Sequence, residues 1–135
     1  MKTTKCLLLV IAALIVCLAG VGGCGDGTEA DEQLIGAECT KLEDCDDDNP
    51  DTPELECILD FKGGYCGRSD CTASSDCPEG SLCAAYESGN YCFRTCTDKP
   101  ECNRNRSVEN ESNCSSNIDP VEGGEEKLCI PPAGI

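Results

Sequence analysis

Cysteine is the feature that most constrains this chain. Fifteen of the 135 residues are cysteine, and twelve of them lie between Cys39 and Cys129. Because twelve is an even number, all of these thiols can pair in an oxidising compartment without leaving a reactive one. Aromatic residues make up 4% of the chain and Trp is absent, so cross-links must replace a large apolar core. The predicted fold class is therefore a small disulfide-rich protein.

The twelve cysteines form an internal repeat of three blocks with four cysteines each. The gaps between cysteines are 5, 11 and 8 residues in the first block, 5, 5 and 8 in the second, and 5, 11 and 14 in the third. Each block opens with Cys-Thr, has an acidic residue just before its second cysteine, and has a glycine-containing turn before its fourth. The repeat predicts cysteine-rich modules at residues 39–66, 71–92 and 96–129. The residues expected in disulfides are Cys39, Cys45, Cys57, Cys66, Cys71, Cys77, Cys83, Cys92, Cys96, Cys102, Cys114 and Cys129.

The second block is the shortest and predicts the local structure most simply. Residues 78–80 form a turn sequence, 82–86 can extend, 88–90 can reverse the chain, and 91–95 can return as a second strand. Related extended segments are expected at 55–61 and 65–66 in the first block, and at 127–130 in the third. A two-stranded hairpin is marginally stable in water, so disulfides must fasten it to the preceding loop. We expect tandem modules of short β-hairpins and mostly irregular loops.

Four cysteines in a block permit three pairings. Pairing the first with the third and the second with the fourth is favoured, because it crosses two loops and locks them. In the second block this joins Cys71 to Cys83 and Cys77 to Cys92. Pairing of adjacent cysteines is the alternative, and bridges between blocks remain open.

The first 23 residues have the layout of a secretory signal, with a basic start, an apolar helix and small residues at the end. The segment Val21-Gly22-Gly23-Cys24 resembles the lipobox of bacterial lipoproteins, although leucine is commonest where Val21 stands. The resemblance implies a signal peptide at 1–23 and lipidation of Cys24 by diacylglyceryl and palmitate-type chains. The even number of remaining cysteines favours this interpretation over an ordinary secretory signal with Cys24 in a disulfide. Gly25, in place of aspartate, favours the outer membrane by resemblance to known sorting preferences.

Residues 24–38 are polar and acidic with several glycines, which predicts a flexible tether between the anchor and the first module. Docking of residues 34–35 on that module is an open alternative. All 26 acidic residues but only eight Lys and Arg residues follow the signal, a net charge of −18. Such a surface repels phosphate backbones and anionic headgroups, which argues against nucleic acid binding and electrostatic membrane binding. Membrane attachment must come from the lipid.

The pattern C-x5-C-P-x-G-x2-C of the second block, followed by a glycine turn and another cysteine, resembles the cysteine-rich modules of extracytoplasmic bacterial lipoproteins. More distantly it resembles Dickkopf-type amino-terminal cysteine-rich domains and EGF-like half-modules. The resemblance implies a lipid-anchored binding, adhesion or scaffold module of the cell envelope without catalytic machinery.

The sequence argues against an enzyme. Histidine is absent, which excludes Ser-His and Cys-His nucleophile systems and the usual zinc site. No cofactor is expected apart from weak calcium. Asp44, Asp46 and Asp48 resemble the opening of an EF-hand loop, and a solvated acidic loop is the alternative interpretation.

Two functions follow from these observations. In the first, Tyr65, Tyr86, Tyr91 and Phe93 are exposed and contact another envelope protein or a glycan. In the second, the chain is a structural or protective surface lipoprotein with no specific ligand. A compact exposed aromatic patch would favour the first, and aromatic side chains buried against disulfides would favour the second.

Overall fold

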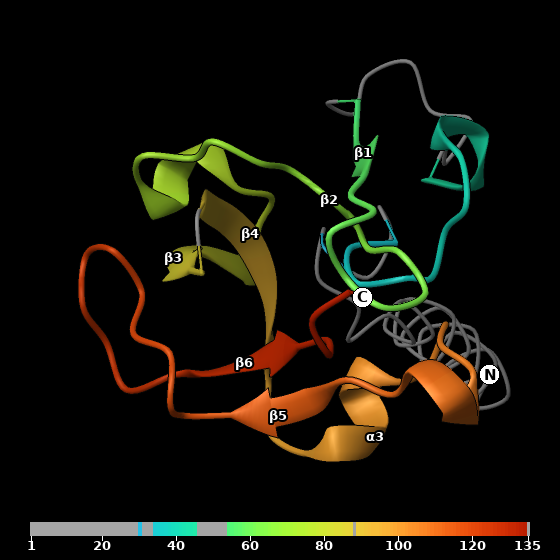
Figure 1. Ribbon diagram of the computed structural model, residues 1–135. Coiled ribbons are helices and arrows are strands. Elements are labelled where there is room, and N and C mark those ends of the chain that lie inside the picture. The colour runs from blue at the N-terminus through green and yellow to red at the C-terminus, as the bar shows by residue number, and fades with distance from the viewer. Residues whose placement is uncertain (1–29, 31–33, 46–53, 88, 135) are drawn as a thin grey trace, which may run out of the picture.

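The computed structural model describes residues 30, 34–45, 54–87 and 89–134 (Figure 1). The predicted signal peptide with Cys24, the start of the tether, and Asp46 and Asp48 of the acidic loop lie outside these residues. The described part of the chain forms two small antiparallel sheets and a few single helical turns.

No helix among the described residues has the length and apolar character needed to cross a membrane.

The first module contains the smaller sheet. A 3-10 turn, η1 (Leu42–Cys45), precedes β1 (Glu56–Cys57) and β2 (Cys66–Gly67), which pair with Glu56 opposite Gly67. The strand expected over 55–61 is therefore shorter than predicted. Its later part bridges elsewhere, because Phe61 pairs with Ala133 near the C-terminus.

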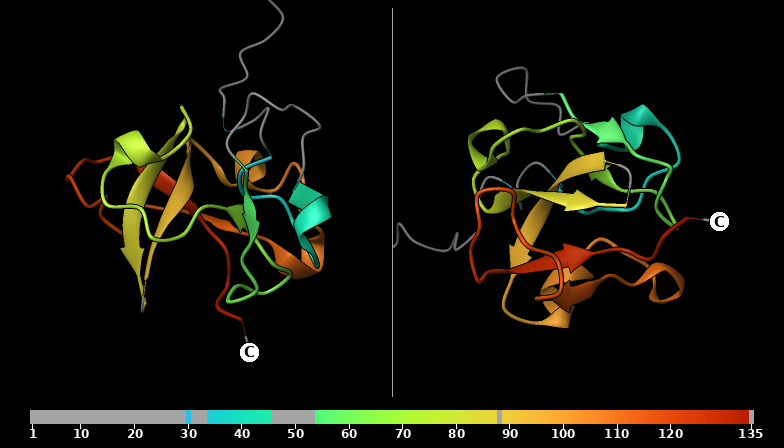
Figure 2. Two further views of the ribbon diagram at one scale, coloured as in Figure 1. Left: turned by 90° about the horizontal axis from the view of Figure 1, so that it is seen from above. Right: turned by 60° about the vertical axis from the view of Figure 1, so that its left-hand side comes forward.

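The second and third modules share the larger sheet, whose strand order is β3-β4-β6-β5. The second module contributes η2 (Ser74–Asp76), β3 (Ser81–Tyr86) and the first half of β4 (Gly89–Cys96). The third contributes α3 (Lys99–Cys102), η3 (Val108–Asn110), β5 (Asn113–Ser115) and β6 (Lys127–Ile130). Strand β4 crosses the boundary, since its last two residues, Thr95 and Cys96, pair with β6. The right-hand view of Figure 2 shows the β3–β4 hairpin between the first module and the β5–β6 pair.

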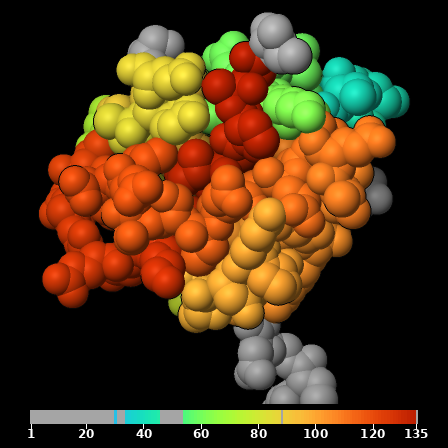
Figure 3. Space-filling view, turned by 60° about the horizontal axis from the view of Figure 1, so that its bottom comes forward, coloured from blue at the N-terminus to red at the C-terminus, as the bar shows by residue number. Residues whose placement is uncertain are grey.

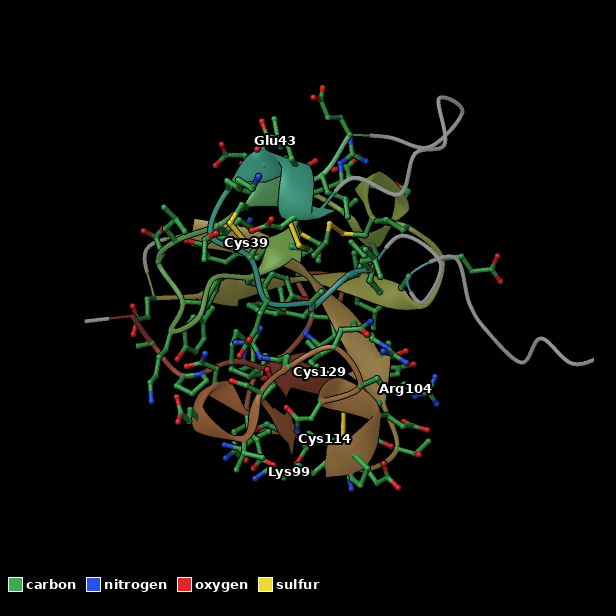
Figure 4. The ribbon with its side chains drawn as sticks, turned by 90° about the vertical axis from the view of Figure 1, so that its right-hand side faces the viewer. Cys39, Glu43, Lys99, Arg104, Cys114 and Cys129 are labelled. Atoms are coloured by element: carbon green, nitrogen blue, oxygen red, sulfur yellow. A yellow bond between two sulfur atoms is a disulfide. The ribbon has the colours of Figure 1, made fainter. Side chains whose placement is uncertain are left out.

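All twelve cysteines of the described modules are paired in six disulfides, each within one module. Each module joins its first cysteine to its third and its second to its fourth, which is the pairing favoured from the sequence. Figure 4 shows Cys39 of the first module in the upper half of the molecule and Cys114 of the third in the lower half. The six bridges are Cys39–Cys57, Cys45–Cys66, Cys71–Cys83, Cys77–Cys92, Cys96–Cys114 and Cys102–Cys129.

A helical turn separates the first and second cysteines of every module, and the repeated threonine and acidic residue close it. In the first module the Asp44 carboxylate accepts hydrogen bonds from the Thr40 backbone N–H at 2.8 Å and the Thr40 hydroxyl at 2.9 Å. Asp76 accepts the same two bonds from Thr72 at 2.8 and 2.9 Å. The sequence shows these residues as a repeat, but it predicts a loop here and not a helical turn. The hydrogen bonds explain why threonine and an acid recur at this spacing.

The third module closes its turn with a longer side chain. The Glu101 carboxylate accepts the Thr97 backbone N–H at 2.7 Å, and the Glu101 N–H donates to the Asp98 carboxylate at 3.2 Å. Donation from the Thr40, Thr72 and Thr97 backbone N–H groups lowers the pKa of Asp44, Asp76 and Glu101 respectively.

The pKa of these acids is lower in the folded protein than in the unfolded chain, where it is about 4. Their hydrogen bonds therefore contribute fully to the free energy of unfolding at pH values above the unfolded-chain pKa. This contribution is lost as pH falls through the folded-state pKa. The guanidinium midpoint of the unchanged protein should fall between pH 7 and pH 2.5, and it should fall less in Asp76→Asn. Both midpoints are measured by circular dichroism with the disulfides intact. Asp119→Asn, at an exposed acid outside these turns, is the control. An unchanged pH dependence in Asp76→Asn would show that the turn contributes nothing to acid sensitivity.

All five aromatic residues of the chain gather in one cluster, which forms the centre of the core. The Phe61 ring lies 5.1 to 5.8 Å from the other four ring centroids. Tyr65 and Phe93 are fully buried, and Tyr91 is only 7% exposed. The expectation that Tyr65, Tyr86, Tyr91 and Phe93 form an exposed contact surface is therefore wrong for three of the four. With few other large apolar side chains, the modules bury these rings between them.

The last residues of the predicted tether belong to the fold. Ile35 is 2% exposed and packs in the core. The Gly36 N–H donates to the Cys66 carbonyl, and the Cys66 N–H donates to the Ala37 carbonyl, both at 2.9 Å. The flexible tether expected over 24–38 is thus wrong for residues 34–38, because Ile35 is buried and the backbone of Gly36 and Ala37 pairs with the first module. The Glu38 N–H donates to the Asn105 carbonyl of the third module at 3.1 Å.

Arg106, in the third module, links that module to the first through hydrogen bonds. Its guanidinium donates to the carbonyl oxygens of Gly36 and Gly64, each at 3.0 Å, and of Lys62 at 2.8 Å, while Nε donates to the Asn110 carbonyl at 2.7 Å. Arg106 is 9% exposed. A buried positive charge is tolerated here because four carbonyl oxygens replace its water.

Glu38 strengthens the same junction. Its carboxylate accepts the Ser107 backbone N–H at 3.0 Å and the Ser107 hydroxyl at 2.7 Å. Partial burial acts to raise the pKa of Glu38, but the hydrogen bonds from Ser107 and the nearby positive charge of Arg106 outweigh it, so this pKa is lowered.

Candidate functional site

A pocket lies where the first module, the tip of the β3–β4 hairpin and the C-terminal segment meet. Figure 3 shows the red C-terminal segment at the surface between the yellow hairpin and the green residues of the first module. The C-terminal segment is held there by backbone hydrogen bonds, from the Lys62 N–H to the Pro132 carbonyl and from the Gly134 N–H to the Asp60 carbonyl. We call it the junction pocket. Its volume is 310 Å³, and it is lined by Leu59, Asp60, Phe61, Tyr86, Glu87, Tyr91 and Gly134.

Three aromatic residues contribute to the lining of the junction pocket. Phe61 and Tyr91 are buried in the core and present part of their surface to the pocket, with ring centroids 5.1 Å apart. Tyr86 is half-buried, and its ring centroid lies 5.7 Å from that of Phe61. Leu59 is 66% exposed at the rim. The pocket is therefore an opening onto the aromatic core rather than a patch on its surface.

The pocket lining also includes two acidic residues, Asp60 and Glu87. The Tyr91 hydroxyl donates to the Asp60 carboxylate over a long distance of 3.4 Å. Burial, and then the negative charges of Asp60, Glu87 and Asp70, raise the pKa of Tyr91. The phenol therefore stays protonated at neutral pH, and the field around it is negative.

Glu87 occupies a backbone position that its side chain does not favour. Tyr86 pairs with Gly89, so Gly89 and Asn90, which were expected in the reversal at 88–90, belong to β4 instead. Glu87 has a φ of +50°, in the left-handed region where glycine, asparagine and aspartate are preferred. The turn alone does not explain a glutamate here, and its carboxylate contributes charge to the rim of the junction pocket.

The residues predicted as a site from the sequence have mixed outcomes. Tyr86 and Tyr91 do line the junction pocket, whereas Tyr65 and Phe93 lie deeper in the core. The Tyr65 hydroxyl donates to the Cys92 carbonyl at 3.1 Å and accepts the Arg94 N–H at 3.4 Å. Tyr65 is thus occupied in joining two modules.

Sequence reasoning missed the remaining pocket residues, which are Leu59, Asp60, Phe61, Glu87 and Gly134. An acidic residue beside an aromatic one, as in Asp60-Phe61, is a weak signal in so acidic a chain. No sequence pattern places Gly134 beside Asp60, because that proximity comes from the path of the C-terminal segment.

The predicted calcium site is described only at Asp44. Its carboxylate oxygen already accepts the Thr40 and Lys41 N–H groups, so it closes the η1 turn. Calcium binding by Asp44, Asp46 and Asp48 stays a prediction. The sulfur atoms of three cysteines approach within 4.8 Å of one another in each module. Because all of them are in disulfides, they offer no thiolate to a metal.

Fold and site together define a class: a small disulfide-rich protein of tandem four-cysteine groups, with a small aromatic, acid-edged pocket at the module junction. A scan against protein-family models finds no match, and no curated protein or solved structure is matched significantly by the chain.

Proposed function

We propose that this protein is a non-catalytic binding module of the bacterial cell envelope, held to the membrane, by preference the outer membrane, through a lipid on Cys24. The observation that carries the binding role is the junction pocket. A disulfide-rich fold needs no opening onto its aromatic core, and the pocket gives a ligand access to Tyr86 and to the exposed part of Tyr91. The disulfides suit an oxidising, extracytoplasmic location.

The binding role is tested by site-specific photo-crosslinking in intact cells. A photoreactive residue replaces Leu59, which is 66% exposed at the pocket rim, or Val108, which is 84% exposed on η3 of the third module. We expect a discrete adduct from position 59 and none from position 108. The same adduct from both positions, or none from position 59, would contradict binding through the junction pocket.

A structural or protective surface lipoprotein is the second candidate, and one observation favours it. Tyr65, Tyr91 and Phe93 are buried rather than exposed, and they pack with cysteine side chains in the core. In that function the six bridges resist proteases and the acidic surface holds water. It predicts that position 59 gives no adduct, and that changes in the pocket have no effect in the cell.

Lipidation is tested on the full chain. We expect Cys24→Ala to move the protein from the membrane fraction to the aqueous fraction and to abolish labelling by a palmitate analogue, because two or three acyl chains dominate the membrane affinity. Replacement of Cys6 by alanine, within the predicted signal, is the matched control and should change neither result. If the Cys24→Ala protein stays in the membrane fraction without an acyl label, the hypothesis of a lipid anchor on Cys24 is wrong.

A further inference from the structure

We propose that the junction pocket receives the basic side chain of an arginine or lysine that protrudes from a partner protein. This inference rests on the proposed binding function and names its ligand. The volume of 310 Å³ is near the lower end of the roughly 300–1,000 Å³ found for small-molecule sites. It suits one inserted side chain better than an extended peptide or an oligosaccharide.

The lining matches a cation in two ways. The half-buried ring of Tyr86 and the exposed part of Tyr91 can attract a positive charge through their ring electrons, whereas Phe61 is only 3% exposed. The lining also includes the acidic residues Asp60 and Glu87, and no lysine or arginine is among the described residues that line the pocket. A neutral sugar would gain neither attraction, and an anion would be repelled.

Asp60 can accept a new donor. Its contact with the Tyr91 hydroxyl, at 3.4 Å, is at the long limit of a hydrogen bond and engages one carboxylate oxygen. An arginine or a lysine head group would add charge-assisted hydrogen bonds, and arginine has the planar geometry that pairs with a carboxylate. The nearest basic residue in the sequence, Lys62, donates instead to the Glu109 carbonyl at 2.8 Å.

The charge of the whole chain favours the same partner. All 26 acidic residues and eight basic residues follow the predicted signal. The resulting field would speed the approach of a basic protein surface and suppress acidic competitors. The pocket then supplies the short-range discrimination that a general acidic surface lacks.

The test uses the exported full chain in a non-ionic maltoside detergent, since a zwitterionic detergent would add a competing quaternary ammonium. The probes are N-acetyl-arginine methylamide, the corresponding lysine amide, the neutral citrulline amide and the disaccharide chitobiose. Two of the three tyrosines line the pocket, so the Tyr86 and Tyr91 ring resonances report binding by NMR. We expect saturable shifts with the arginine and lysine probes, and citrulline to bind at least about five-fold more weakly.

Charge-matched variants locate the effect. Asp60→Asn and Glu87→Gln should each weaken the arginine probe by about two- to five-fold. Asp119→Asn and Glu125→Gln change the net charge equally at exposed sites outside the pocket and should leave its affinity unchanged. Equal weakening by all four variants would mean that the acidic surface, rather than the pocket, attracts the cation, and would overturn the inference.

The remaining outcomes separate this inference from the binding function on which it rests. Equal binding of arginine and citrulline, or binding of chitobiose in their place, would reject the basic ligand and leave a binding pocket. Absence of shifts at Tyr86 and Tyr91 with every probe would also reject the basic ligand. The adduct from position 59 then decides the binding function independently.

Discussion

Reduction of the six disulfides should unfold this protein at neutral pH without any denaturant. The loops that they close separate cysteines by 12 to 27 residues, and one bridge across such a loop contributes about 3 kcal/mol. Six contributions of this size exceed the roughly 5–15 kcal/mol by which most domains are stable. The aromatic cluster, with five rings, is too small to compensate. Loss of amide dispersion in NMR spectra after addition of a phosphine reductant would show the unfolding.

Replacing both cysteines of one disulfide measures the contribution of that single bridge to stability. Replacing both Cys71 and Cys83 by alanine opens the shortest loop, of 12 residues, and replacing Cys102 and Cys129 opens the longest, of 27. Each double replacement should lower the free energy of unfolding by about 2–5 kcal/mol. The loss should be larger for the longer loop, but the two losses should differ by less than about 1 kcal/mol. A fully reduced chain that keeps its native spectrum would show that packing alone maintains the fold.

Loss of the Arg106 guanidinium should separate the first module from the third. Arg106→Met keeps much of the apolar stem but leaves the carbonyl oxygens of Gly36, Lys62 and Gly64 without their donor. Each buried carbonyl oxygen left without a donor costs about 1–3 kcal/mol, so we expect a loss of about 3–5 kcal/mol for the set. We expect the midpoint of guanidinium denaturation to fall accordingly, and amide hydrogen exchange to speed up in residues 34–38.

Arg104→Met is the matched control, because Arg104 is exposed two residues earlier in the same loop (Figure 4). It should change the free energy of unfolding by less than about 1 kcal/mol. Arg106→Lys should lie close to Arg106→Met, since one ammonium cannot reach carbonyl groups that a planar guanidinium spans. Equal stability of the Arg106 and Arg104 variants would mean that the modules are held together by the aromatic cluster and backbone pairing instead.

Several features of this fold were predictable because their causes are local in the sequence. The cysteine spacing predicts the number of modules, and the glycine turns predict the β3–β4 hairpin and β6. The favoured disulfide pairing follows from the need to lock two loops, and it is the pairing in the structure. The Cys-Thr pairs and the acids at fixed spacing were visible as a repeat, although their role in closing helical turns was not.

Only part of the junction pocket could be predicted from the sequence. Tyr86 and Tyr91 were singled out as aromatic residues in an aromatic-poor chain. Asp60 and Gly134 meet because the C-terminal segment returns to the first module, where the Gly134 N–H donates to the Asp60 carbonyl at 2.6 Å. Such a contact joins residues more than seventy positions apart, and no local pattern encodes it.

By itself, the sequence determined the disulfide modules, because cysteine spacing and turn residues act over short stretches of chain. Only the tertiary structure decided how the modules combine: β4 pairs with β6 across the module boundary, five rings meet around Phe61, and Arg106 reaches carbonyl oxygens as far back as Gly36. The physical reason is that no module has enough apolar surface to form its own core. Each buries its few large side chains against the others, and the surface left open at their junction is the pocket.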